Sequence, residues 1–93
     1  MQTAIELIRA ERKRQIDAEG WTPEHDDAHE CHELSEAAAC YALGVKTAVA
    51  PDGTRVPLWP WDESWWKPTD RVRDLVKAGA LIVAEIERLQ RAA

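Results

Sequence analysis

Residues 69–93, TDRVRDLVKAGALIVAEIERLQRAA, are the stretch that decides the fold. Apolar residues recur along it every three or four positions, which is the period of one face of an α-helix. This stripe comprises Val72, Leu75, Val76, Gly79, Ile82, Val83, Ile86 and Leu89. Thr69 is a candidate N-cap, and Gly79 costs helix stability unless a second helix approaches closely there. The pattern predicts a long helix whose apolar face must be covered.

The first twenty residues predict a second amphipathic helix. Thr3 and Glu6 form a capping-box pattern, and Gly20 is a typical helix stop. Between them the apolar residues recur at helical spacing, at Ile5, Ile8 and Ile16. We therefore expect a helix over residues 3–19.

An alanine-rich stretch predicts a third helix, over residues 28–43, that ends at Gly44. Thr22 followed by Pro23 is a further helix-start signal upstream of it. The four prolines that follow prevent long regular structure. Within that segment, PDG at 51–53 is typical of a small hairpin turn.

These elements predict an all-α fold. Three main helices, with a long Trp- and Pro-rich loop between the second and the third, form a single domain over residues 1–93. A domain of this size covers three apolar stripes poorly, so we expect a helical bundle completed by oligomerisation, as a dimer or higher. The formal net charge of −5 argues against direct nucleic-acid binding. Without a membrane-length apolar run or a signal peptide, the expected location is cytoplasmic, with no membrane attachment.

Four of the five tryptophans lie in ten residues, Trp59–Pro68, with the sequence WPWDESWWKP. The chain has no phenylalanine, so these rings can roof the helices in its place. Alternatively, their faces can stack on a nucleotide base, with Lys67 directed at the phosphates. We expect two of the four rings to roof the core and the other two to line a pocket. The same loop can also serve as a surface for a protein partner.

Two carboxylates, Glu33 and Glu36, stand at i and i+3 on one face of the expected second helix. Such a pair suits Mg²⁺ or Mn²⁺, although it also suits an ordinary solvated helix start. Asp74 on the last helix can face this pair if the two helices pack together. Zinc is a further alternative because of the three histidines, but the chain contains neither HExxH nor CxxC. These histidines are His25, His29 and His32.

Four strings of the sequence carry a resemblance to known proteins. They are EGWTPEHDD, HELSEAAACYA, WPW…WWKP and RDLVKAGALIVAEIERLQR. Together they resemble a group of short phage and prophage proteins, over nearly the whole chain from Glu11 to Arg91. That group is similar to the MazG-like, all-α nucleotide pyrophosphohydrolases, some of them labelled dATP/dGTP diphosphohydrolases.

The resemblance implies an oligomeric helical bundle that uses Mg²⁺ or Mn²⁺ to split a nucleoside triphosphate into a monophosphate and pyrophosphate. Glu33 and Glu36 match the catalytic, metal-binding ExxE motif of such proteins. The second motif, ExxD, is degenerate, because Arg71 stands where glutamate is expected before Asp74. The implied metal ligands are Glu33, Glu36, Asp74, Asp70 and Asp27. The expected nucleotide-binding residues are Trp59, Trp61, Trp65, Lys67 and Arg71. The alternative function is a non-enzymatic phage interaction module that uses the Trp-rich loop.

Overall fold

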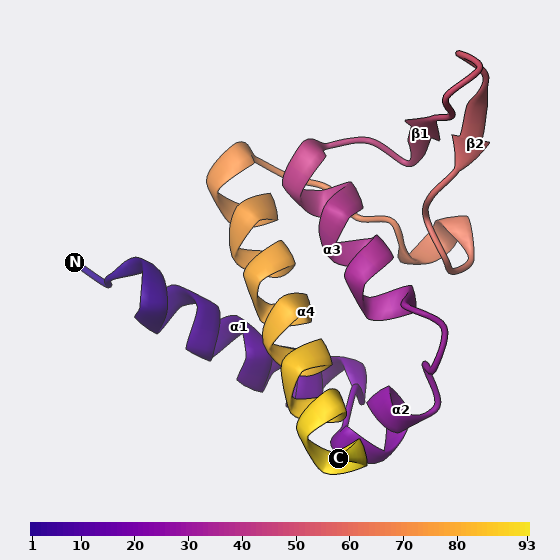
Figure 1. Cartoon of the computed structure of the whole chain (residues 1–93). Coiled ribbons are helices and arrows are strands. Elements are labelled where there is room, and N and C mark those ends of the chain that lie inside the picture. Colours follow the sequence, from indigo (N-terminus) through magenta and orange to yellow (C-terminus); the bar gives the residue numbers. More distant parts are fainter.

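The structure is a computed structural model that describes all 93 residues, Met1–Ala93. It contains four α-helices, a two-stranded antiparallel sheet and a turn of 3-10 helix (Figure 1). The elements are α1 (Ala4–Glu19), α2 (Pro23–Asp27), α3 (Glu33–Leu43), β1 (Thr47–Val49), β2 (Arg55–Pro57), η1 (Glu63–Trp65) and α4 (Arg71–Ala92). The predicted all-α fold of three main helices and a loop is therefore wrong, because the chain has a fourth helix and a small sheet.

Short sequence signals determine where most of the helices and strands begin and end. Thr3 and Glu6 form the predicted capping box, and Gly20 ends α1 in the left-handed region with a φ of 73°. Gly44 ends α3 in the same way. The predicted hairpin is confirmed, since β1 and β2 pair across the turn that contains Asp52. At the start of α4 the cap is Asp70, which accepts from the backbone N–H of Arg73, and not Thr69.

The predicted helix over 28–43 begins five residues too early. Thr22 caps α2, as its position before Pro23 predicts, but α2 ends at Asp27. His32 then has a φ of 69°, in the left-handed region, and α3 begins only at Glu33. This break carries no glycine or proline, which are the residues that usually announce one.

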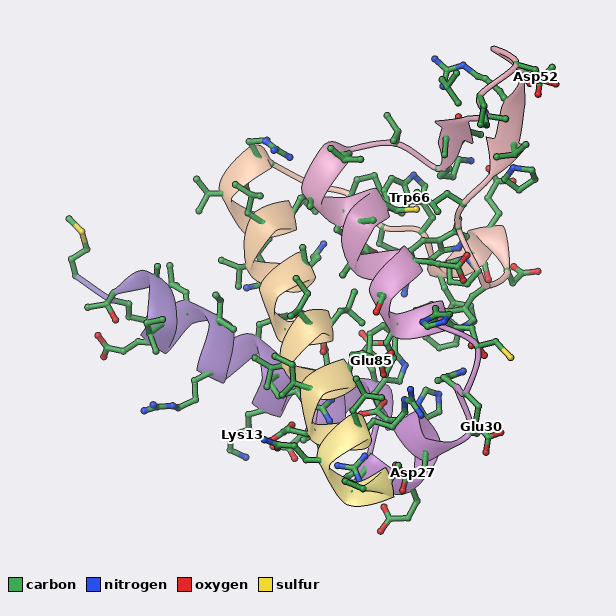
Figure 2. The ribbon with its side chains drawn as sticks, in the orientation of Figure 1. Lys13, Asp27, Glu30, Asp52, Trp66 and Glu85 are labelled. Atoms are coloured by element: carbon green, nitrogen blue, oxygen red, sulfur yellow. The ribbon has the colours of Figure 1, made fainter.

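The centre of the fold is the antiparallel pair α3 and α4 (Figure 1). Near the start of α3, Ser35 Oγ lies 3.4 Å from Oε2 of Glu85, and in Figure 2 Glu85 lies between the two helices. Near the end of α3, the ring of Tyr41 lies 5.4 Å from Nζ of Lys77, two turns earlier on α4. The core between them is small and rich in alanine, comprising Leu34, Ala37, Ala38, Tyr41, Ala78, Leu81 and Ala84.

α1 packs against α4 at Gly79. A Cβ added at this glycine would lie 2.7 Å from Cδ1 of Ile8, which is closer than carbon atoms pack. The predicted close approach is therefore confirmed, and it is made by α1 of the same chain.

One face of α4 stays uncovered. We call it the α4 seam, and its residues are each between 45% and 64% exposed: Val72, Leu75, Ile82, Ile86 and Leu89. With Gly79 between Leu75 and Ile82, these positions alternate in steps of three and four, as at a helix–helix seam, but Ile8 of α1 covers the seam at Gly79. Although α4 carries this seam, neither it nor any other helix is long and apolar enough to cross a membrane.

Candidate functional site

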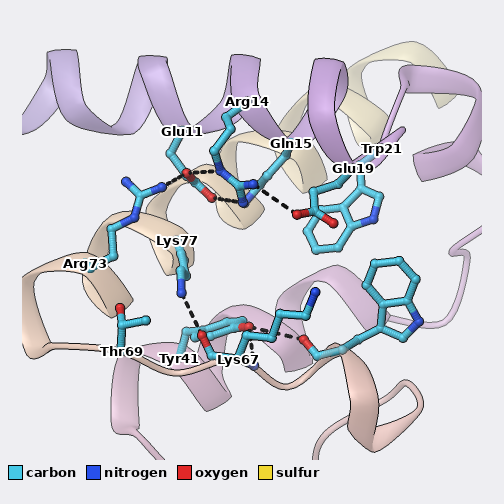
Figure 3. A pocket seen from close by; sticks show the side chains of 11 residues that line it. Glu11, Arg14, Gln15, Glu19, Trp21, Tyr41, Lys67, Thr69, Arg73 and Lys77 are labelled. Atoms are coloured by element: carbon cyan, nitrogen blue, oxygen red, sulfur yellow. Dashed lines mark hydrogen bonds and ion pairs between the residues drawn. The ribbon is translucent and has the colours of Figure 1, made fainter.

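A cleft lies between α1 on one side and α3, α4 and the tryptophan loop, Trp59–Pro68, on the other (Figure 3). We call one of its cavities, of about 390 Å³, the polar chamber. Four cationic and two anionic side chains line it, so its formal net charge is four minus two, or +2. They are Arg14, Lys67, Arg73 and Lys77, with Glu11 and Glu19. The chain as a whole carries −5, so this local excess of positive charge favours an anionic ligand.

Glu11 holds two of these cations in place. Its fully buried carboxylate accepts hydrogen bonds from Nε of Arg14 at 2.8 Å and from Nη2 at 2.9 Å, and it also pairs with Arg73 of α4. Burial alone would raise the pKa of Glu11, but the hydrogen bonds and charge of Arg14, and then the charge of Arg73, lower it. The ionised carboxylate thus joins guanidinium groups from two helices at one edge of the chamber (Figure 3).

Tyr41 fixes the tryptophan loop to the other side of the chamber. Its hydroxyl accepts from the backbone N–H of Lys67 at 3.1 Å and donates to the carbonyl oxygen of Trp65 at 3.4 Å. Burial raises the pKa of Tyr41, so the phenol stays neutral. Nζ of Lys67 lies 5.4 Å from the ring centroid of Trp65. The loop therefore presents an aromatic face and a cation side by side.

Lys77 is less exposed than the arginines of the chamber. Its side chain is 12% exposed, against 42% for Arg14 and 36% for Arg73. Nζ donates to the carbonyl oxygen of Lys67 at 2.7 Å and lies 3.9 Å from Oδ1 of Asp74. Burial lowers the pKa of Lys77, and the nearby Asp74 opposes that effect. An anion close to this ammonium stabilises its charged form.

Three of the four loop tryptophans, Trp59, Trp61 and Trp66, pack against the core, where we expected two, and Trp61 also lines a cavity. Trp59 and Trp66 pack against Tyr41, with ring centroids 5.6 and 4.8 Å away, and neither lines the cleft. Trp65 lines the polar chamber, and Trp61 lines the cavity beside it. Trp59 thus has a core position where we expected a nucleotide contact.

The two cations predicted to contact the nucleotide have different positions. Lys67 lines the polar chamber, whereas Arg71 is exposed at the start of α4 and does not. Arg73 takes the expected place instead, because it lies about half a turn further round the helix.

The ExxE pair and Asp74 lie at opposite ends of the antiparallel pair α3 and α4. Glu33 is at the start of α3, where it accepts from the backbone N–H of Cys31 at 2.6 Å, and Glu36 follows one turn later. Asp74 lies near the other end of α3 and accepts from the backbone N–H of Thr69 at 2.8 Å. The predicted sharing of one cation by these three carboxylates therefore has no support in the fold of one chain.

The remaining predicted ligands are also engaged elsewhere. Asp70 caps α4, and Asp27 pairs with Arg91 at 2.7 Å. The chain contains no group of three His, Cys, Asp or Glu side chains placed to hold a metal ion. The residues present in one chain thus do not fit the Mg²⁺ or Mn²⁺ site that the resemblance implies, nor the alternative zinc site.

Most of the polar chamber was not predicted from the sequence. The missed residues are Glu11, Arg14, Gln15, Glu19, Trp21, Tyr41, Thr69, Arg73 and Lys77. The sequence contained part of the signal for these residues, because Glu11, Arg14 and Gln15 share one helical face, and Arg73 and Lys77 share another.

No protein-family model matches the chain, and neither does any curated protein or solved structure.

Proposed function

We propose that the protein binds a nucleoside triphosphate in the polar chamber and hydrolyses it to a nucleoside monophosphate and pyrophosphate. The observation that supports binding is the convergence of four cations from α1, the tryptophan loop and α4 on an otherwise acidic chain. Guanidinium and ammonium groups are the usual partners of phosphate oxygens. The exposed ring of Trp65 adds a stacking face that a plain phosphate does not need. Support for hydrolysis comes from the resemblance to the MazG-like enzymes.

In this reaction water attacks the α-phosphorus, the bond from that phosphorus to the bridging oxygen breaks, pyrophosphate leaves with an added negative charge, and the attacking water releases a proton to the solvent. The cations of the chamber offset that charge, which is how preorganised positive groups speed phosphoryl chemistry. Arg14 and Arg73 suit this role because Glu11 fixes their positions before the ligand arrives.

The test is a screen of the common ribo- and deoxyribonucleoside triphosphates, with Mg²⁺ or Mn²⁺ in the buffer, that detects released pyrophosphate. We expect turnover of at least one nucleotide. Binding in calorimetry without release of pyrophosphate would refute the hydrolysis, and the absence of both would refute the proposed function.

Lys67→Ala is expected to weaken nucleotide binding about tenfold, since a hydrogen bond to a charged group contributes about 1.5–3 kcal/mol. Lys67 is exposed, and its backbone contacts with Tyr41 and Lys77 survive the substitution, so the fold should persist. Calorimetric titration of an α,β-methylene nucleotide, which resists this hydrolysis, measures the affinity. Lys13→Ala is the matched control, because it removes the same charge from a side chain that is 77% exposed and pairs with Asp17. Equal nucleotide affinities of the Lys67→Ala and Lys13→Ala variants would count against nucleotide binding in the polar chamber.

Nucleotide affinity is expected to fall as the pH rises from neutral through the free-state pKa of Lys77, which lies below that of an ordinary lysine, and Lys77 should account for part of the fall. Burial lowers the pKa of Lys77 in the free protein, whereas a bound phosphate favours the ammonium and raises it. Binding is therefore strongest below the free-state pKa of Lys77 and weakens as the pH rises through it. Lys77→Arg keeps its charge over this range. A pH profile of the dissociation constant as steep in this variant as in the parent would contradict the assignment.

A further inference from the structure

A second cavity, of about 400 Å³, adjoins the polar chamber and shares Glu19, Trp21 and Trp65 with it. We call it the aromatic chamber. Its own walls are His25, His29, Trp61 and Asp62. The ring centroids of Trp21 and Trp61 are 5.7 Å apart, and those of His29 and Trp61 are 5.2 Å apart. Rings at these spacings pack against one another, and the chamber lies against their remaining surface.

The charge of the aromatic chamber is opposite to that of its neighbour. It has no lysine or arginine in its lining, and it contains two carboxylates. Glu19 uses Oε1 to bind Arg14 at 3.0 Å, and Asp62 uses Oδ1 to accept from the backbone N–H of Ser64 at 2.9 Å. The second oxygen of each carboxylate has no hydrogen-bond partner. The chamber therefore disfavours a phosphate and favours a flat ring that carries N–H donors, as nucleobases do.

The walls also contain polar atoms that the chain leaves unsatisfied. Nε2 of His29 and Nε1 of Trp61 are buried without a hydrogen-bond partner. His29 is held only from its other nitrogen, where Nδ1 lies 3.4 Å from Oε2 of Glu33. Leaving such atoms unpaired is unfavourable, so packing between these rings does not by itself explain their arrangement.

We infer that the aromatic chamber is the base subsite of the nucleotide whose phosphates occupy the polar chamber. The inference rests on the proposed function for the phosphates and adds where the base lies. The base lies in this chamber against the ring faces of Trp21 and Trp61, beside the imidazoles of His25 in α2 and His29 before α3. Trp21 and Trp65, with ring centroids 6.1 Å apart, line both chambers, so the sugar lies beside these two rings.

The test compares two ligands, the α,β-methylene analogue of ATP and inorganic tripolyphosphate, which has the phosphates but no base. The parent is expected to bind the nucleotide at least tenfold more tightly than tripolyphosphate, since stacking of a base on an aromatic side chain is worth about 5- to 150-fold. Trp61→Leu should lose about tenfold in nucleotide affinity and keep its affinity for tripolyphosphate within about twofold. Trp59→Leu is the control, because that ring packs on the core outside both chambers.

Each outcome separates the base subsite from the proposed function. If the parent binds both ligands equally, or if Trp61→Leu weakens both equally, the base subsite is refuted and the phosphate site stands. If the parent binds neither ligand, the proposed function fails. Should Trp61→Leu fail to fold, His25→Ala replaces it, because that side chain lines the same chamber and is 39% exposed. A loss of nucleotide affinity below about twofold in His25→Ala would then refute the subsite.

Discussion

Replacing Asp26 by alanine is expected to lower the free energy of unfolding by about 3–5 kcal/mol, the usual effect of removing one partner from a buried ion pair. Asp26 is 1% exposed, and its Oδ2 lies 2.6 Å from Nη2 of Arg12, whose side chain is 9% exposed. Without the carboxylate, the buried guanidinium keeps only the carbonyl oxygen of Trp21, at 3.2 Å, and a longer contact with Glu87. Domains of this size have only about 5–15 kcal/mol of stability, so the loss is a large fraction of the total.

Urea unfolding measures this effect as a shift of the midpoint at unchanged slope. The matched control is Asp17→Ala, which breaks an ion pair between Lys13 and Asp17 on the surface of α1. Those side chains are 77% and 56% exposed, so the expected loss is below about 0.5 kcal/mol. Equal midpoints for the two variants would mean that the buried pair does not hold α2 to α1.

A charge introduced into the α4 seam is expected to prevent self-association. We expect the parent to have at least twice the 10.5 kDa mass of one chain, with a second copy covering the exposed residues of the seam. These residues lie on either side of Gly79, where α1 of the same chain already packs. In such a dimer, Ile82→Glu or Ile86→Glu buries an unpaired carboxylate, so the dissociation constant should rise at least about 100-fold.

Light scattering over a range of concentrations checks the mass. Val49→Glu is the control, since Val49 is 63% exposed on β1, away from the seam. The prediction fails if the parent stays at 10.5 kDa at every concentration, or if the seam variants associate as the parent does.

The parts of the fold that could be predicted were those set by short-range signals. The capping box at Thr3, the stop at Gly20 and the hairpin turn each depend on a few adjacent residues, and all three are present. The break at His32 was not predicted, because histidine adopts the left-handed region in only a minority of cases, although more often than most residues do. Because of that break, the helix expected over residues 28–43 begins only at Glu33.

The residues of the candidate site could likewise be predicted only where they lie close together in the sequence. Trp65 and Lys67 were found because they lie in one conspicuous loop, whereas Trp21 reaches the cleft from the connection between α1 and α2, and Tyr41 reaches it from α3. Their meeting depends on how α1 crosses α4 and on the direction of α3, and hydrophobic periodicity specifies neither. Because α3 runs antiparallel to α4, Glu33 and Asp74 lie far apart, although both are on helices that pack together.

α2 is held in place by contacts with both α1 and α4. We therefore expect ligand binding in the aromatic chamber to be linked to the local unfolding of α2. Arg12 of α1 binds Asp26, and Arg91 in the last turn of α4 binds Asp27 and the carbonyl oxygen of Pro23. A five-residue helix does not persist alone, so α2 unfolds whenever these contacts open. The amide protons of α2 should then exchange faster than those of α3 and α4, and a ligand against His25 should slow them. Mild denaturant should likewise abolish the preference for nucleotide over tripolyphosphate before it unfolds the core, because the aromatic chamber keeps its shape only while α2 is folded.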